Sequence, residues 1–526
     1  MWLVAVAVAG GGPMSTQVLY DANDPDSVAL ALAYAEARDV PENRLCGLQG
    51  PFEPVVDLAT FESTIKEPWE ACRRDDTDVL VLVKGLPYRV TLSTFHASLE
   101  AVLQVGNGTQ SGEVVVGRGQ STQGSTAYAS VNNPAVVYAG HISSDFTLSN
   151  PTQSYYTTTS GLVRQAWPVG FSRQKRWEWG SLEMTGELLV VSRLDGWTFD
   201  DAHALIERAL LAESAVPEGE WLCMAASDGA RGPRDPECEF AVRKLAELGV
   251  EATWLPSFDA TLSDRTVLAY FTGSANLKGA IDGLEYAPGA FADNLTSYGA
   301  VPDNFCETCT ESQTSIARFV RAGASAAHGT VAEPLNNVFP NAGTLLLYSQ
   351  GYALGESVLY NQRHLYWQNL LLGDPLMTPF DERPTVSLWA PAQVGVPAVF
   401  SGQHPRGIGS MEVWQDGELL VEGDGDFIEV LFSEEGSEEV VVIAVALGHT
   451  ETVPWPMEEV TIDPRTQGWG VFTVEVGPAP VDTGDSGQDT GQPTEDCGGC
   501  GTPLAVPVWT LVALGMWTRR RRQDGA

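Results

Sequence analysis

One histidine and two acidic residues are the side chains of this sequence best suited to acid–base chemistry. His328 lies in a short run of small residues, Glu333 follows five positions later, and Asp195 follows an apolar run. An imidazole that a carboxylate orients can take up and release protons near neutral pH. One hypothesis is therefore a hydrolase site built from these three residues. The alternative is that His328 is a structural residue of a strand.

Charged residues that follow predicted strands are candidates to line a ligand crevice, because the loops at the carboxyl ends of parallel strands form such crevices. Lys84 and Arg89 could bind an anionic ligand, or they could pair with Asp195 or Glu100. Asp195 could anchor its own loop, and Asp374 could turn the chain. The candidates are Lys84, Arg89, Arg193, Asp195 and Asp374.

Four of the eight cysteines form two couples that each span one short structural unit. Local pairing of an even number of cysteines favours disulfides in an oxidising compartment. We predict that Cys46 pairs with Cys72 and that Cys223 pairs with Cys238.

The other four cysteines form two Cys-x-x-Cys motifs, Cys306 with Cys309 and Cys497 with Cys500. Such a motif could be a disulfide or part of a zinc site, and a redox role would need a site that stabilises a thiolate. The acidic spacer before Cys497 lacks the converging oxygens of a calcium loop. We therefore expect no metal site and no cofactor.

The elements that must position these residues alternate between strands and helices. Residues 78–84 form an apolar run that suits a buried parallel strand, and residues 200–213 form an amphipathic helix. This alternation predicts a doubly wound α/β body over residues 14–383, with a mainly parallel sheet and helices on both faces. Residues 104–180 are rich in Gly, Ser and Thr, so we expect an insertion of loops and short strands there.

A different composition begins at residue 384. Residues 384–475 hold 16 acidic residues, two arginines and no lysine, and short alternating runs are separated by Asp-Gly turns. This pattern predicts an antiparallel, immunoglobulin-like β-sandwich over residues 384–478, acting as a spacer or a binding module. The net charge of the whole chain is −38, which argues against a nucleic-acid partner because phosphates would be repelled.

Both ends of the chain have the composition of targeting segments. Residues 1–13 contain an apolar run and a small-residue pattern typical of a signal peptide, although a buried first strand is the alternative. Residues 479–502 form an acidic, DTG-rich linker that cannot build a core. Residues 503–526 hold an apolar run that we expect to form a short transmembrane helix, although it is shorter than the roughly 20 residues of a full membrane span. It is followed by Arg519, Arg520, Arg521 and Arg522.

Three stretches resemble an uncharacterised family of exported bacterial proteins that accompanies exosortase-type sorting systems. They are VLVKGLPYRV, LLVVSRLDGWTFDDAHALIERALLAE and GDPLMTPF, and the similarity runs from about Thr16 to Phe380. The family has no established activity, so the resemblance implies export and a shared fold.

A more distant resemblance is to gingipain-type cysteine peptidases, which have a caspase-like fold. The similar order includes a strand ending in Gly273-Ser274, a Gly-Ala strand and a final Gly-Asp-Pro. The peptidases carry a histidine after the first strand and a cysteine after the second, as thiolate chemistry requires. This sequence has Thr272 to Ser274 at the first place and Asn294 to Ser297 at the second, without a histidine or a cysteine. The resemblance therefore implies a caspase-like body without a Cys-His dyad.

The C-terminal order of spacer, cysteine, apolar run and arginines resembles the MYXO-CTERM sorting tail. This resemblance implies a sorting protease of the myxosortase type as partner, with processing at Cys497 or Cys500. It places the precursor in the inner membrane and the mature protein on the cell surface or outer membrane. A plain tail anchor in the membrane is the alternative.

Three functions remain open on the sequence alone. The first is an exported surface protein whose body binds an unknown ligand or envelope component and does not cleave peptides. The second is a hydrolase built around His328, Glu333 and Asp195. The third is a structural protein of the envelope.

Overall fold

The computed structural model describes most of the chain between residues 11 and 480. The described residues are 11–74, 76–92, 95–104, 131–132, 176–179, 182–185, 189–309, 313–334, 336, 339–362, 364–365, 367–448, 451–455, 458–462 and 465–480. The signal-like segment 1–10, most of the insertion 104–180, and the tail with Cys497, Cys500 and the arginines lie outside these residues.

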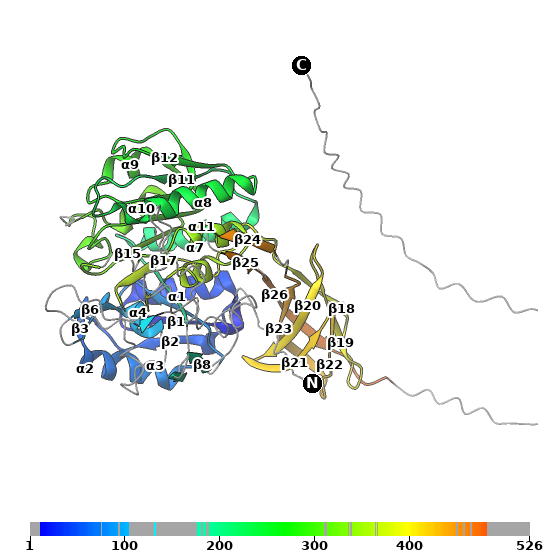
Figure 1. The fold of residues 1–526 in the computed structure, drawn as a ribbon. Helices are drawn as coiled ribbons and strands as arrows, with labels where there is room; N and C mark the ends of the chain where they lie inside the picture. The colour runs from blue at the N-terminus through cyan, green and yellow to red at the C-terminus, as the bar shows by residue number, and fades with distance from the viewer. Residues whose placement is uncertain are drawn as a thin grey trace, which may run out of the picture. The chain divides into compact units, whose positions relative to one another are not determined.

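A ten-stranded sheet forms the centre of the α/β body (Figure 1). Its strands are, in spatial order, β12 (Ala252–Leu255), β11 (Glu220–Met224), β13 (Thr266–Thr272), β14 (Glu285–Asn294), β15 (Ala326–Thr330), β17 (Asn369–Gly373), β10 (Val190–Leu194), β4 (Val79–Val83), β1 (Thr16–Asp21) and β2 (Leu45–Leu48). The predicted parallel-rich sheet flanked by helices is confirmed. Strands β4 and β10 are buried along their whole length, as expected for a sheet that is covered on both faces.

The sheet contains two parallel groups with the same strand order. In the first group β1 pairs with β2 and β4, and β4 pairs with β10, all parallel. In the second group β11 pairs with β12 and β13, which is followed by β14 and β15, again all parallel. In each group the first strand lies between the second and the third. Strand β17 runs antiparallel to β15 and meets β10 at the pair Arg193–Leu372.

Helices form two layers around the sheet. In one layer α1 (Pro25–Arg38) contacts α7 (Phe199–Ser214), which contacts α10 (Ile316–Ala322), which contacts α9 (Lys278–Gly283). In the other layer α11 (Gly343–Ser349) contacts both α8 (Asp235–Glu247) and α12 (Leu354–Leu359). Helix α4 (Leu99–Gln104) packs on β10.

Side chains cap the helices that leave the carboxyl ends of strands. Asp24 accepts the Asp26 backbone N–H at the start of α1, and Ser315 accepts that of Ala317 before α10. Thr198 and Asp201 bond to each other's backbone N–H at the start of α7. These caps satisfy backbone donors that a helix cannot satisfy internally, so they fix where each loop ends.

Loops from both parallel groups meet at the carboxyl edge of the sheet. Trp197, after β10, donates its indole N–H to the carbonyl of Asn304, which follows β14, at 2.9 Å. The ring of Tyr88, after β4, lies 4.5 Å from the ring of Phe305. A small sheet of β3 (Val55–Asp57), β5 (Arg89–Leu92) and β6 (Phe95–Ser98) belongs to the segment that includes Tyr88.

Antiparallel sheets follow the body and are separate from the ten-stranded sheet. One contains β18 (Thr385–Ala390), β19 (Ala398–Gln403) and β22 (Phe427–Val430). The other contains β21 (Glu418–Asp424), β20 (Ile408–Gln415), β23 (Gly436–Ala446) and β26 (Gln467–Val476). Phe400, Met411 and Val442 are among the apolar residues that they bury between them.

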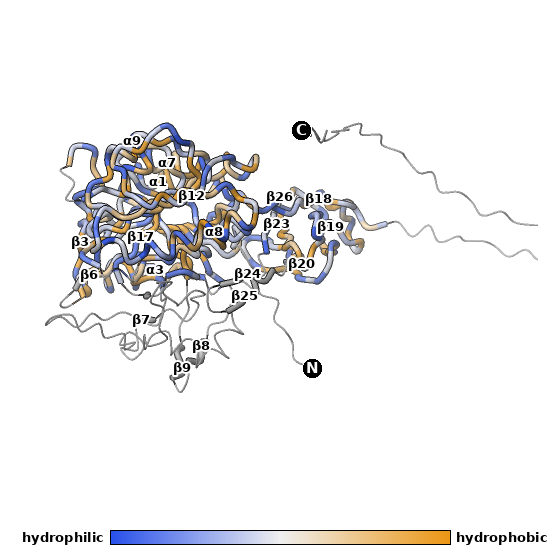
Figure 2. The backbone as a smooth tube through the Cα atoms, turned by 45° about the horizontal axis from the view of Figure 1, so that its top comes forward, coloured by the Kyte–Doolittle hydropathy of each residue, from blue (hydrophilic) through white to orange (hydrophobic). Residues whose placement is uncertain are grey.

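The remaining described elements are short. They are α2 (Leu58–Phe61), α3 (Glu67–Cys72), β7 (Val131–Asn132), β8 (Arg176–Trp179), β9 (Leu182–Thr185), β16 (His364–Leu365), β24 (Glu451–Trp455) and β25 (Glu458–Ile462). Figure 2 shows that apolar and polar segments alternate along the backbone of the body and the antiparallel sheets. Within the described ranges, no helix combines the length and the apolar character that crossing a membrane requires.

Candidate functional site

The ends of β4 and β10 are joined by a charged pair. The ammonium of Lys84 lies 2.9 Å from Oδ1 of Asp195 and 2.7 Å from the carbonyl oxygen of Gly196. The hydroxyl of Tyr88 donates to Oδ2 of Asp195 at 2.7 Å, and Asp195 is fully buried. Burial and the neighbouring Asp195 carboxylate raise the pKa of Tyr88 well above its usual value, so its phenol stays protonated and donates.

Arg193 extends this pair into a buried network. Its guanidinium lies 2.5 Å from Oε1 of Glu100, and it donates to the carbonyls of Leu86 and Pro87 at 3.0 and 2.6 Å. It also lies over the ring of Tyr88, 4.6 Å from the centroid. Burial raises the pKa of Glu100, although Arg193 acts to lower it. Arg193 is fully buried, so it holds the loop after β4 and is not exposed to a ligand.

At the corresponding place in the second group, a neutral pair joins the ends of β13 and β14. The side-chain oxygen of Asn294 accepts the backbone N–H of Ser274 at 2.7 Å, and its amide donates to the carbonyl of Ser274 at 2.9 Å. Both residues are buried. The hydroxyl of Ser274 turns to its own loop and donates to the carbonyl of Asn276 at 3.1 Å. The two residues belong to the stretches, Thr272 to Ser274 and Asn294 to Ser297, in which the gingipain-type resemblance would place the histidine and the cysteine.

A second set of contacts holds the loop after β14. Arg231 bonds to the hydroxyl of Thr296 at 3.2 Å and to the side-chain oxygen of Gln313 at 3.0 Å. Thr296 also bonds to Gln313. The hydroxyl of Ser297 donates to Glu333 at 2.8 Å. Thus the hydroxyls near the carboxyl edge stabilise loops.

His328 lies at the junction of β14, β15 and β17. Its Nδ1 is 3.1 Å from Oδ2 of Asp293, and its Nε2 is 3.2 Å from the side-chain oxygen of Asn369. Arg234 approaches the same Asp293 oxygen at 3.0 Å. His328, Asp293 and Arg234 are at most 5% exposed. This buried chain of polar contacts ties the second parallel group to β17.

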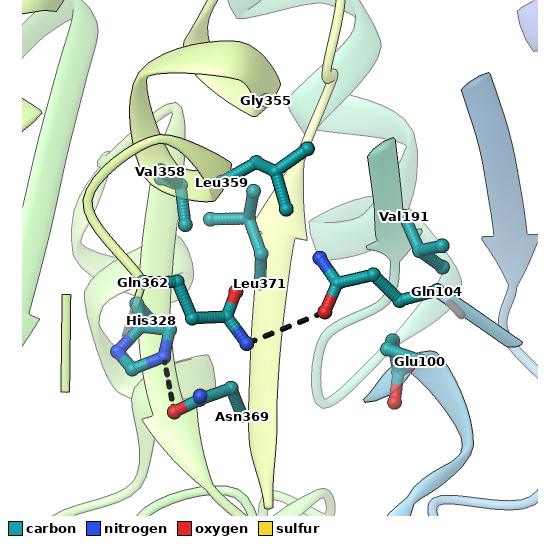
Figure 3. Close-up of a pocket in the computed structure, with 10 residues that line it drawn as sticks. All are labelled: Glu100, Gln104, Val191, His328, Gly355, Val358, Leu359, Gln362, Asn369 and Leu371. Atoms are coloured by element: carbon teal, nitrogen blue, oxygen red, sulfur yellow. Dashed lines mark hydrogen bonds between the residues drawn. The ribbon is translucent and has the colours of Figure 1, made fainter. Parts of the chain in front are cut away.

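A small cavity lies beside His328 (Figure 3). Its volume is about 20 Å³, and its polar lining includes Glu100, Gln104, Gln362 and Asn369. Gln362 donates to the side-chain oxygen of Gln104 at 3.3 Å across it. A space of this size accommodates about one water molecule, so it is too small for a substrate.

The three residues of the hydrolase hypothesis have separate partners. Asp195 contacts Lys84 and Tyr88, His328 contacts Asp293 and Asn369, and Glu333 contacts Ser297. No hydrogen bond or ion pair joins any two of the three among the described residues. The geometry therefore provides no acid–base pair from this set.

Arg89 differs from the other crevice candidates because its guanidinium has no ion pair and no side-chain hydrogen bond within the described ranges. Its Nε is buried and without a partner. Burial lowers the pKa of Arg89, and Asp303 and Tyr298 partly offset that effect. Nearby His96 also has a lowered pKa, first because of burial and then because of the charge of Arg89.

Asp374 lies in another network and not in the crevice. It accepts from Arg38 at 2.7 Å, from the hydroxyl of Tyr34 at 2.9 Å and from the backbone N–H of Leu376 at 2.9 Å. Arg38 also pairs with Glu213, at the end of α7. Asp374 therefore turns the chain and anchors α1, and its interpretation as a crevice residue is wrong.

The cysteines divide into bonded and free pairs. Disulfides join Cys46 to Cys72 and Cys306 to Cys309. The predicted disulfide between Cys223 and Cys238 is wrong, because both are free, buried thiols. They face each other between β11 and α8, and burial raises the pKa of Cys223 well above its usual value. Among the described residues, no cluster of His, Cys, Asp and Glu could hold a metal ion.

Sequence reasoning missed Arg234, Asp293 and the role of Asn294. Arg234 follows a loop with two glycines, and Asp293 lies next to the last residue of β14, a strand that contains Pro288-Gly289, so neither had a periodic signal. Asn294 was visible only as the residue that stands where a nucleophile was expected. Its bonds to the Ser274 backbone depend on the neighbouring strand, which the local sequence does not contain.

Comparisons with known proteins add little to this geometry. No family model matches the chain, and no curated protein matches it. A solved structure described as "Structure of Protease" is similar over 88% of this chain and 98% of its own, with 11% identity and a TM-score of 0.43. A likeness of this strength carries no argument about activity.

Proposed function

We propose that this chain is an exported cell-surface protein whose α/β body binds a ligand or envelope component and does not cleave peptides. One observation carries the proposal. Asn294 and Ser274, at the ends of β14 and β13, bond to each other at the place where a caspase-like peptidase would hold its nucleophile and its base.

The chemistry of peptide cleavage explains why this pair matters. A cysteine peptidase needs a thiolate to attack the carbonyl and an imidazolium to protonate the leaving amine. The amide of Asn294 is engaged by two bonds to the backbone, and the Ser274 hydroxyl faces its own loop. The free thiols Cys223 and Cys238 are buried in the core. A body of this kind can recognise a partner while lacking a nucleophile at the crevice.

The disulfides support export. Cys46 with Cys72 and Cys306 with Cys309 suit an oxidising compartment outside the cytosol. The signal-like start and the MYXO-CTERM-like tail agree with this location. In this proposal a myxosortase-type protease processes the tail, and the immunoglobulin-like antiparallel domain acts as a spacer or a second binding module.

The test is a peptide-library screen of the purified chain, combined with reactive probes for thiols and hydroxyls. We expect no peptide turnover above buffer and no probe label on Ser274, Thr296 or Ser297. The Asn294→Ala variant should also be inactive, because it removes only a loop contact.

Turnover that is lost in a His328→Ala variant with an unchanged unfolding curve would contradict the proposal and favour the hydrolase. Comparison of surface-released protein with the precursor by mass spectrometry tests the tail. Peptides that run through Trp517 in the mature form would exclude processing near Cys500 and indicate a plain tail anchor.

A further inference from the structure

We propose that Arg89 anchors a binding site for a ligand carboxylate, at the seam between β5 and the loop that follows β14. This inference rests on the proposed binding function and names the chemistry of its ligand. It separates Arg89 from Lys84, which the sequence had treated as an equivalent candidate.

The first observation is that Lys84 and Arg89 differ in whether they have a bonding partner in the protein. Lys84 is paired with Asp195 and also bonds to the carbonyl of Gly196. The guanidinium of Arg89 has no protein partner within the described part of the chain, and its Nε is buried. An unpaired polar group at a partly buried site is unfavourable and calls for an explanation, such as a ligand.

The second observation is the direction of the side chain. Arg89 pairs across the small sheet with Ser98 of β6, so the two side chains share a face. Ser98 is fully buried and donates to the carbonyl of Asn369, so its end of this face packs against the body, whereas Arg89, Thr91 and His96 along the same face are half-buried. Arg89 accordingly feels Asp303 and Tyr298 of the loop after β14. The half-buried side chain of Arg89 therefore lies at the edge of the seam, with its Nε buried.

The opposite side of the seam is rigid. Tyr298 has a φ of 62°, in the left-handed region that residues other than glycine rarely adopt. Its N–H donates to the carbonyl of Ala332 at 3.2 Å, and its carbonyl accepts from Asn304 at 2.8 Å. Strained backbone of this kind concentrates at ligand sites, where the surroundings fix it.

The charge balance selects a carboxylate. A guanidinium presents its donors as a planar fork that matches the two oxygens of a carboxylate. Asp303 lies nearby and the chain carries a net charge of −38, so a doubly charged phosphate would meet strong repulsion. A singly charged carboxylate, from a free acid or from a peptide C-terminus, needs only one cation.

The experiment titrates the purified chain at constant ionic strength with acetate, N-acetylglycine and neutral N-acetylglycinamide, and follows the heat of binding. We expect both carboxylates to bind at least tenfold more tightly than the amide. If N-acetylglycine binds more tightly than acetate, the ligand is the C-terminus of a peptide. If the two bind equally, the ligand is a free acid. Arg89→Met should weaken carboxylate binding at least tenfold, and Arg89→Lys should lie between, because it keeps the charge without the fork.

The matched control is Arg243→Met, on the exposed side of α8, which should bind as the unaltered chain does. Arg89→Met should unfold at the same temperature as the unaltered chain or higher, since it removes an unpaired charge. If that variant does not fold, ¹⁵N-arginine spectra of the unaltered chain still decide: an Nε–H signal that is absent from Arg89→Lys should shift with acetate.

Equal binding of the carboxylates and the amide, or equal binding by Arg89→Met and the unaltered chain, would overturn the site. Peptide turnover is measured in the same samples. No carboxylate binding and no turnover would overturn the Arg89 site alone, whereas turnover would overturn the proposed function itself.

Discussion

The two parallel groups of the sheet repeat one strand order but join the ends of their third and fourth strands by different chemistry. In the first group β4 and β10 are joined by Lys84 and Asp195, within a buried network of charges. In the second group β13 and β14 are joined by the neutral pair of Ser274 and Asn294.

Strand order therefore determines where two loops meet, but it does not determine which side-chain contacts hold the loops together. A buried charge is favourable only when all its partners are present, because its desolvation is costly. The first group should therefore depend on every member of its network. Removing a neutral amide that bonds to the backbone lowers the free energy of unfolding by less.

The largest effect is expected from Asp195→Ala in the first group. The change removes the partner of Lys84 and Tyr88 and leaves Arg193 buried with less compensation. Breaking such a network should lower the free energy of unfolding by about 3–5 kcal/mol. Urea denaturation measures this value, with exposed Glu239→Ala on α8 as a control that should stay within about 0.5 kcal/mol. A loss below about 1 kcal/mol would remove the contrast between the groups.

The next effect is a pH dependence that arises at the end of α7, in the first group. Burial acts to raise the pKa of Glu213, but Arg383 and Arg38 lower it to about 2. Because this pKa lies below the unfolded value of 4.5, the stabilisation is complete above pH 4.5 and is lost as the pH falls toward 2.

The loss of unfolding free energy should be roughly 3 kcal/mol, because it follows from the difference between the folded and the unfolded pKa of Glu213. Unfolding free energies between pH 5 and pH 2 measure it, and hydrogen exchange should show α1 and α7 opening before α8. In the Glu213→Gln variant, the slope of unfolding free energy against pH should lose the part that Glu213 contributes between pH 5 and pH 2. An unchanged slope in that variant would assign the acid sensitivity to other carboxylates.

A smaller effect is expected from Asn294→Ala in the second group. The change leaves a buried N–H and carbonyl of Ser274 without partners, which should cost about 1–3 kcal/mol. Ser274→Ala is the matched control and should cost less, because it removes only a hydroxyl. In the double variant Asp195→Ala, Asn294→Ala, the two losses of unfolding free energy should add to within about 0.5 kcal/mol. A larger coupling would mean that the two groups do not act separately.

The smallest effect concerns thiols and should leave stability unchanged. The first group contains the disulfide Cys46–Cys72, whereas the second contains the free pair Cys223 and Cys238. In a Cys497→Ser, Cys500→Ser chain, a thiol reagent should not react under native conditions and should label both buried cysteines after unfolding. If the unfolded chain showed no reactive thiol, Cys223 and Cys238 would be joined by a disulfide and this prediction would be wrong.

Part of this molecule could be predicted from sequence because its signals are local. The run VLVLV at 79–83 and the amphipathic segment at 199–214 show their own periodicity, and both elements form as expected. The large parallel-rich sheet follows from such alternation. The antiparallel sheets after residue 384 follow from alternating residues and Asp-Gly turns.

The remainder depends on neighbours that are distant in sequence. The sequence left Asp374 as either a turn residue or a crevice residue, because its partners Arg38 and Tyr34 are more than 300 residues away. Cys223 and Cys238 are near each other in sequence, yet both are free thiols in the core. Spacing alone did not distinguish Arg89 from Lys84, because they differ in whether a carboxylate lies within hydrogen-bond distance, as Asp195 does for Lys84.

Strand β17 has a consequence for how the chain is made. It lies between β15 and β10 in the sheet, yet it comes from residues 369–373, after all the other strands of that sheet have been synthesised. A nascent chain that lacks it exposes two open strand edges, which pair readily with other chains. We expect the body to mature only after this segment emerges, so chains truncated before residue 369 should aggregate, while chains truncated after residue 383 should remain monomeric in size-exclusion chromatography.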